Sequence, residues 1–301
     1  MDLKKILVIF SVLWAQTSMA ATPSLLFEGW FQVLLGSKKI GYLVERYEFK
    51  DGKFLVTTYL KTNADGNNVT ESLKGVSGGD LTPISYQYTS KVGDKIKLID
   101  ATVKGDTMTL TILDGSKKTQ TTKRFKKGTF LSSMLIYLVL SQKNGLKVGN
   151  DFKYNAIAEE EGTAYTGSIL VKNQEPVRGK PATRLINEFK GDKYITWVTA
   201  RGETLLTRQP DRNVDVRFAE TKAEATEGLT VNNKDLELLF GKIPGDAATP
   251  AATPSKKSTP GKKATPAAEP DDSTTASPSA APNATQAPVE IKGVPPPKND
   301  P

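Results

Sequence analysis

Histidine and cysteine are absent from all 301 residues of this chain, and each absence excludes a class of chemistry. Neither a Ser-His-Asp triad nor a Cys-His pair can form. Without thiols there is no disulfide and no redox centre, and a zinc site would have only carboxylate ligands, which is unusual. We therefore expect no catalytic residues, no metal site and no cofactor.

One enzymatic class survives these absences. Glycoside hydrolases use a pair of carboxylates, whose roles depend on a spatial separation that a sequence does not reveal. The chain carries 33 acidic residues, so such a pair is available. We predict a non-enzymatic envelope binding or scaffold protein, and the alternative is a carboxylate-dependent cell-wall hydrolase.

The first twenty residues have the pattern of an export signal. Lys4 and Lys5 precede a nine-residue run at 6–14 that is apolar except for Ser11, and small residues follow before Ala20. The pattern predicts a signal peptide over 1–20 with cleavage after Ala20. The alternative, a transmembrane anchor, would need about 20 apolar residues. We expect a periplasmic or secreted bacterial protein without such an anchor, and therefore no nucleic acid partner.

The last 57 residues, 245–301, differ in composition from the rest. They hold twelve of the 18 prolines, and Ala, Thr, Ser and Lys make up most of the remainder. Such a segment has too little apolar surface to offset its ordering entropy, so we predict a disordered tail. Its lysines and acids cancel, and the signal contributes +1 of the total +8, which leaves +7 for residues 21–244.

Residues 21–244 read as an antiparallel β domain. Apolar and polar residues alternate over 42–49, a run rich in β-branched and aromatic residues follows at 54–60, and Asp51-Gly52 lies between them as a hairpin signal. Similar turn residues recur every ten to fifteen residues, and strands are predicted again over 151–158, 164–172, 182–189, 194–200 and 203–208. Val214–Phe218 is predicted as an edge strand, and Leu236–Phe240 as a helical turn that docks the chain.

One segment breaks the strand rhythm. Residues 130–142 are apolar almost all round and end at Asn144-Gly145, which is typical of a helix C-terminus, while Thr129 is placed to cap the start. A buried strand is the alternative. The fold class that follows is mainly β: a long curved antiparallel sheet, half-barrel or sandwich-like, with one apolar helix on its inner face. A carrier would use that helix as a movable lid over an apolar ligand, whereas a scaffold would hold it as fixed core.

Three sequence segments carry a family resemblance. Residues 36–42, Gly-Ser-Lys-Lys-Ile-Gly-Tyr, resemble the strand entry of exported β modules that precede the catalytic domain in bacterial periplasmic transglutaminase-like proteins. Residues 145–150, Gly-Leu-Lys-Val-Gly-Asn, resemble the segment that follows the central helix in those modules. Residues 197–206 resemble a strand pair of those modules and of uncharacterised periplasmic proteins whose sheet is similar to that of lipoprotein carriers. The resemblance covers about residues 27–220 and implies the accessory module alone, since the chain lacks the Cys-His pair of the catalytic domain.

A basic strip is the candidate binding site. Six cations fall within eleven residues that contain no acid: Lys117, Lys118, Lys123, Arg124, Lys126 and Lys127. On a strand, Lys118, Arg124 and Lys126 would share a face with Thr122. Such a strip suits an anionic envelope component or an acidic patch on an envelope protein. The alternative is an edge strand on which the lysines prevent aggregation.

Two smaller features have simpler interpretations. Glu159-Glu160-Glu161 is predicted to be a solvated turn, since adjacent acids seldom converge on one calcium ion without other ligands. Trp30 and Trp197 are predicted to belong to the core or to a half-buried sheet face.

Overall fold

Turn residues divide the chain into antiparallel strands, as their spacing predicts. The computed structural model describes residues 24–64 and 66–245. Its strands are β1 (Ser24–Leu35), β2 (Lys38–Lys50), β3 (Lys53–Ala64), β4 (Asn67–Gly78), β5 (Pro83–Val92), β6 (Lys95–Lys104), β7 (Thr107–Asp114), β8 (Lys117–Arg124), β9 (Phe130–Leu131), β10 (Asp151–Ala158), β11 (Thr163–Val177), β12 (Lys180–Phe189), β13 (Asp192–Val198), β14 (Thr204–Gln209) and β15 (Val214–Ala219). Its helices are η1 (Ser132–Met134), α1 (Leu135–Ser141), η2 (Pro210–Arg212), α2 (Lys222–Thr226) and α3 (Asn233–Phe240).

All fifteen strands belong to one sheet, which confirms the predicted fold class. The order is β8-β7-β6-β5-β4-β3-β2-β1-β15-β14-β13-β12-β11-β10-β9, so two meanders meet where β1 pairs with β15. Trp30 lies opposite Ala219 in that ladder. The prediction that Val214–Phe218 is an edge strand is wrong, because the strand lies at the middle of the sheet. Its partner, β1, is far away in sequence, and local pattern does not identify it.

The β2–β3 hairpin shows why the turns could be predicted. Asp51 and Gly52 connect β2 to β3, and both have positive φ, at 50° and 72°. Asp tolerates this left-handed region better than most residues, and Gly adopts it without a steric penalty. A two-residue turn of this geometry matches the twist of the strands that it joins.

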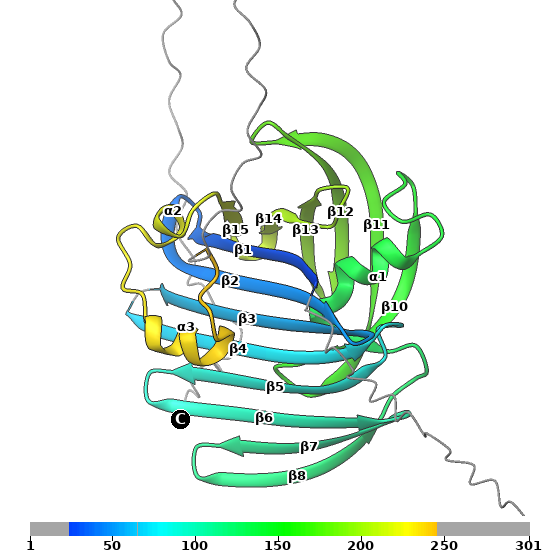
Figure 1. The fold of residues 1–301 in the computed structure, drawn as a ribbon, viewed down its shortest axis with the longest axis vertical. Coiled ribbons are helices and arrows are strands. Elements are labelled where there is room, and N and C mark those ends of the chain that lie inside the picture. The colour runs from blue at the N-terminus through cyan, green and yellow to red at the C-terminus, as the bar shows by residue number, and fades with distance from the viewer. Residues whose placement is uncertain (1–23, 65, 246–301) are drawn as a thin grey trace, which may run out of the picture.

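The sheet curves around α1 (Figure 1). We call the face that α1 covers the inner face. Met134 and Val139 are fully buried there and pack in one cluster with Tyr86 and Ile99 from the first meander and Ile169 from the second. Leu131 also reaches β4, where a Cβ atom on Gly75 would lie only 3.0 Å from Leu131 Cδ1. Parts of the sheet that are distant in strand order therefore enclose one core.

The predicted helix over 130–142 is shorter than expected. Phe130–Leu131 form β9, which pairs in parallel with β10, and Ser132–Met134 form the 3₁₀ turn η1, so α1 begins at Leu135. Thr129 does not cap the helix, because its hydroxyl donates to the carbonyl of Lys126. The apolar character that suggested a longer helix is accounted for by burial of both Leu131 and Met134.

The opposite, outer face is covered near its centre by α2 and α3 (Figure 1). Trp30, Tyr42 and Tyr59 point to this side and pack against Leu236 and Phe240 of α3, which confirms that 236–240 dock the chain. Arg46 Nη1 and Nη2 donate to the carbonyls of Phe240 and Lys242, and Trp30 Nε1 donates to that of Pro244. Strand β2 and the end of the domain are thus joined by hydrogen bonds and by packing.

The predicted signal peptide and all but the first residue of the predicted tail lie outside the described residues. Within residues 24–64 and 66–245, no helix has the length and apolarity needed to cross a membrane.

Removing residues 246–301 should leave the melting temperature of the domain nearly unchanged. Among the described residues, the last docking contact is made by Gly245, whose N–H donates to Glu28 Oε1, and the deleted segment contains few apolar side chains larger than alanine. Thermal denaturation followed by circular dichroism would measure this. A second truncation that also removes residues 233–245 is the comparison, and it should destabilise the domain because Leu236 and Phe240 are buried. A large loss with the first truncation would contradict the prediction.

Candidate functional site

A cavity of about 350 Å³ lies on the inner face beside η1 and α1. We call it the inner-face cavity. Its lining comes from both meanders and from the helical segment, and it combines aromatic and aliphatic side chains with hydroxyl, amide and carboxyl groups. The lining residues are Phe31, Leu43, Glu45, Tyr47, Ser132, Ser133, Leu135, Ile136, Tyr154, Glu160, Asn187, Phe189, Tyr194, Thr196, Thr204, Thr207 and Val216. Its walls therefore come from segments that meet only because the sheet curves.

Glu45 is the distinctive group of this cavity. Strand alternation places it on the inner face between Leu43 and Tyr47, which also line the cavity. Its carboxyl forms no hydrogen bond or ion pair with any described residue, and burial raises its pKa from 4.5 to about 7. A carboxyl that is desolvated without a partner is costly when charged, so it favours a ligand that supplies a donor or a positive charge.

The other polar groups of the cavity are largely satisfied by one another. Tyr154 donates its hydroxyl hydrogen to Asn187 Oδ1, and the hydroxyls of Thr196 and Thr207 are 3.2 Å apart across the β13–β14 ladder. The hydroxyl of Tyr47 donates to the carbonyl of Ser133 at 3.1 Å. These bonds hold the lining in place and leave Glu45 as the unpartnered carboxyl among the described lining residues.

The prediction of a solvated turn is wrong for Glu159, which is only 4% exposed. Its carboxylate accepts bonds from the Ser132 and Ser133 hydroxyls and from the Ser133 backbone N–H. Burial raises the pKa of this carboxyl, while the three bonds oppose the rise. Glu159 therefore ties η1, and with it the start of α1, to the end of β10.

Glu160 and Glu161 bind a different partner, Lys190. Lys190 Nζ lies 2.7 Å from Glu160 Oε1 and also forms an ion pair with Glu161. The three acids of this turn do not converge on one point, and no group of three acidic residues suited to a metal ion occurs in the described part of the chain. The turn is thus a structural junction between β10, η1 and β12.

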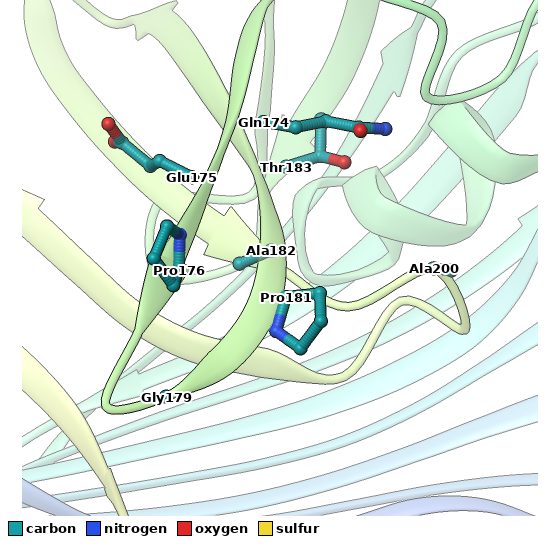
Figure 2. Close-up of a pocket in the computed structure, with 8 residues that line it drawn as sticks. All are labelled: Gln174, Glu175, Pro176, Gly179, Pro181, Ala182, Thr183 and Ala200. Carbon is teal, nitrogen blue, oxygen red and sulfur yellow. The ribbon is translucent and has the colours of Figure 1, made fainter.

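A second depression, of about 370 Å³, lies at the tip of the β11–β12 hairpin (Figure 2). Gln174 and Thr183 lie side by side across the ladder, whereas Glu175 points away from them in Figure 2. The Glu175 carboxylate accepts from Trp197 Nε1 and from Asn173 Nδ2. Polar groups do not converge here as they do in the inner-face cavity, so we do not treat it as the main site. Trp30 and Trp197 are both buried, as predicted.

The basic strip is divided by the sheet. Lys118 and Arg124 lie on the outer face of the edge strand β8, together with Thr122 as predicted. Lys123 points to the inner side, where Nζ donates to the Gly162 carbonyl and the Thr163 hydroxyl. Lys126 and Lys127 follow β8 in a turn, so the prediction that Lys126 continues the alternation is wrong. Lys117 begins the strand and is exposed.

The sequence contains a pattern that indicates Glu45, although the basic strip is the more conspicuous feature. An acidic residue at the centre of a run whose same-face neighbours are Leu43, Tyr47 and Phe49 is an exception to the alternation of apolar and polar faces. Such an exception marks a half-buried carboxyl on an otherwise apolar face, which structures retain mainly where it has a partner or a role.

No known protein family, no curated protein and no solved structure matches this chain. The similarity of residues 27–220 to exported accessory modules therefore stays a prediction.

Proposed function

We propose that this protein is a non-enzymatic binding protein of the bacterial envelope, periplasmic or secreted, which holds a small and mainly apolar ligand in the inner-face cavity. The observation that carries this proposal is the unpartnered Glu45 carboxyl within a lining of aromatic and aliphatic side chains. Ligand pockets typically combine such a lining with a few polar groups that orient the ligand. The ligand that fits is an apolar molecule with one amino or N–H group facing Glu45.

The size and position of the cavity support this proposal. Its volume of about 350 Å³ falls within the range of small-molecule pockets, roughly 300–1,000 Å³. Leu135 and Ile136, at the first turn of α1, form one wall, so a small displacement of this helix changes the access to Glu45. The predicted export signal supports an envelope location, and the chain has no His or Cys for the common nucleophilic mechanisms.

Binding of N-phenyl-1-naphthylamine, an apolar fluorophore with one N–H donor, tests the site. We expect fluorescence enhancement with the wild-type chain and its loss with Thr196→Trp, because the new side chain fills the cavity. Thr102→Trp is the matched control, since Thr102 is exposed on β6. Glu45→Gln keeps the volume and should weaken binding of the probe, because the neutral amide replaces the carboxylate that accepts the N–H hydrogen bond. No enhancement with the wild type, or equal enhancement with Thr196→Trp, would refute the proposal. Native mass spectrometry of the purified chain would identify a natural ligand.

The alternative is the carboxylate-dependent cell-wall hydrolase, and one observation favours it. A general acid must hold its proton near neutral pH, and the pKa of Glu45 is about 7. Glu160 is the second carboxyl of the lining, but it is paired with Lys190. Release of soluble sugar from purified cell-wall glycan by the wild type, and its absence with Glu45→Gln, would establish the hydrolase and overturn the binding function.

A further inference from the structure

The outer face of strands β4 to β8 carries an unbalanced charge. Five cations point to this face: Lys74 on β4, Lys91 on β5, Lys104 on β6, and Lys118 and Arg124 on β8. All five are exposed, and none forms an ion pair with a described residue. The acids on this side are Asp100 on β6 and Asp235 at the first turn of α3. This face therefore carries a net charge of +3 from these seven residues, out of +7 for residues 21–244.

Exposed aliphatic side chains lie among these cations. Of six large apolar residues that are exposed in the described chain, three belong here: Ile96 at 43%, Leu98 at 37% and Leu238 of α3 at 85%. Ile96 is the register partner of Lys91, and Leu98 and Lys118 both pair with Leu113. Leu238 and Ile96 line one groove of about 380 Å³ between α3 and the sheet. We call this surface the outer patch: Ile96, Leu98, Leu238, Lys74, Lys91 and Lys118.

Aliphatic groups next to unpaired cations specify the chemistry of the partner. Lysines near an anionic bilayer gain favourable energy from the surface potential, and aliphatic side chains gain more when they enter the interface. A soluble polyanion would use the cations and leave the aliphatics in water. Short polar side chains on this face, such as Ser72, Thr89 and Thr102, also allow close approach to headgroups.

We infer that the outer patch docks the protein on a bilayer containing anionic lipid. Lys74, Lys91 and Lys118 contact phosphate headgroups, and Leu238 enters the interface. This inference does not depend on the inner-face cavity, because the patch lies on the opposite face of the sheet. Docking on a bilayer would bring the protein close to a source of apolar molecules, the class of ligand proposed for the inner-face cavity.

Vesicle co-sedimentation of the whole chain tests the docking surface. The probes are vesicles of phosphatidylcholine alone and of phosphatidylcholine mixed with phosphatidylglycerol. We expect binding to the mixed vesicles only, with a steep decrease as salt is raised. Lys91→Gln and Lys118→Gln should each lower the partition coefficient about fivefold. Leu238→Ser should lower it about tenfold through lost apolar contact.

Matched controls separate docking from general charge and folding effects. Lys143→Gln and Val148→Ser change exposed residues in the loop after α1, away from the outer patch, and should bind as the wild type does. Circular dichroism of each variant checks that the fold is retained. Equal binding by the wild type and the outer-patch variants would overturn the inference. Loss of binding with the lysine variants but not with Leu238→Ser, together with competition by heparin, would also overturn it in favour of a soluble polyanion.

Discussion

Replacing Met134 with aspartate is expected to prevent the domain from folding. Met134 is fully buried where η1 meets α1, and its neighbours in the core are aromatic and aliphatic side chains. An unpaired charge at such a position costs at least about 4 kcal/mol, which approaches the whole stability of an ordinary domain, about 5–15 kcal/mol. Circular dichroism and thermal denaturation would show loss of the cooperative transition.

Three other substitutions define the expected range of destabilisation. Met134→Leu keeps the volume and should cost less than about 1.5 kcal/mol. Leu138→Asp should destabilise less than Met134→Asp because Leu138 is only half-buried, whereas Leu238→Asp should leave the melting temperature unchanged because Leu238 is 85% exposed. Wild-type melting of Met134→Asp would mean that α1 does not belong to the core.

The Glu45→Gln variant is expected to be more stable than the wild type above neutral pH and equally stable in acid. The unfolded chain releases the Glu45 proton near pH 4.5, whereas the folded chain holds it until about pH 7. Deprotonation therefore favours the unfolded state as pH rises between these values, and the penalty is constant above about pH 7. The difference between the two pKa values corresponds to about 3 kcal/mol.

Urea denaturation at about pH 4 and about pH 8 would measure this contribution. Burial also raises the pKa of Glu71 and of Glu159, so part of the pH dependence should remain in the variant. Glu188→Gln, at an exposed position on β12, is the control and should follow the wild type at both pH values. Parallel behaviour of Glu45→Gln and the wild type would show that Glu45 is solvated.

The sequence was sufficient for those parts of the fold that depend on neighbouring residues. Asp51-Gly52 identified the β2–β3 hairpin because positive φ is a local requirement, and the predicted strand over 151–158 coincides with β10. Val214–Phe218 was predicted as a strand but misplaced, since its partner β1 is chosen by packing across the whole sheet. Local pattern therefore defines strands better than it defines their neighbours.

The candidate site was harder to predict for a related reason. The basic strip is visible as a run of lysines, but its division between two faces depends on where β8 ends. The Glu159 carboxyl looks like one of three solvated acids until Ser132 and Ser133 are brought to it by the parallel β9–β10 pairing. The inner-face cavity is built from β1, β2, η1, α1, β10 and β12 to β15, so it exists only after the two meanders join.

The single junction between β1 and β15 also determines the order of events during biogenesis. Each meander forms from hairpins whose strands are consecutive, so both can assemble as soon as their residues emerge. Strand β1 must wait for a partner that is made last, and closing that loop has the largest entropic cost of any strand pairing in the sheet. Until then β1 presents an open hydrogen-bonding edge, on which chains self-associate. The time between synthesis of the first and the final strand thus sets the aggregation risk of the newborn chain.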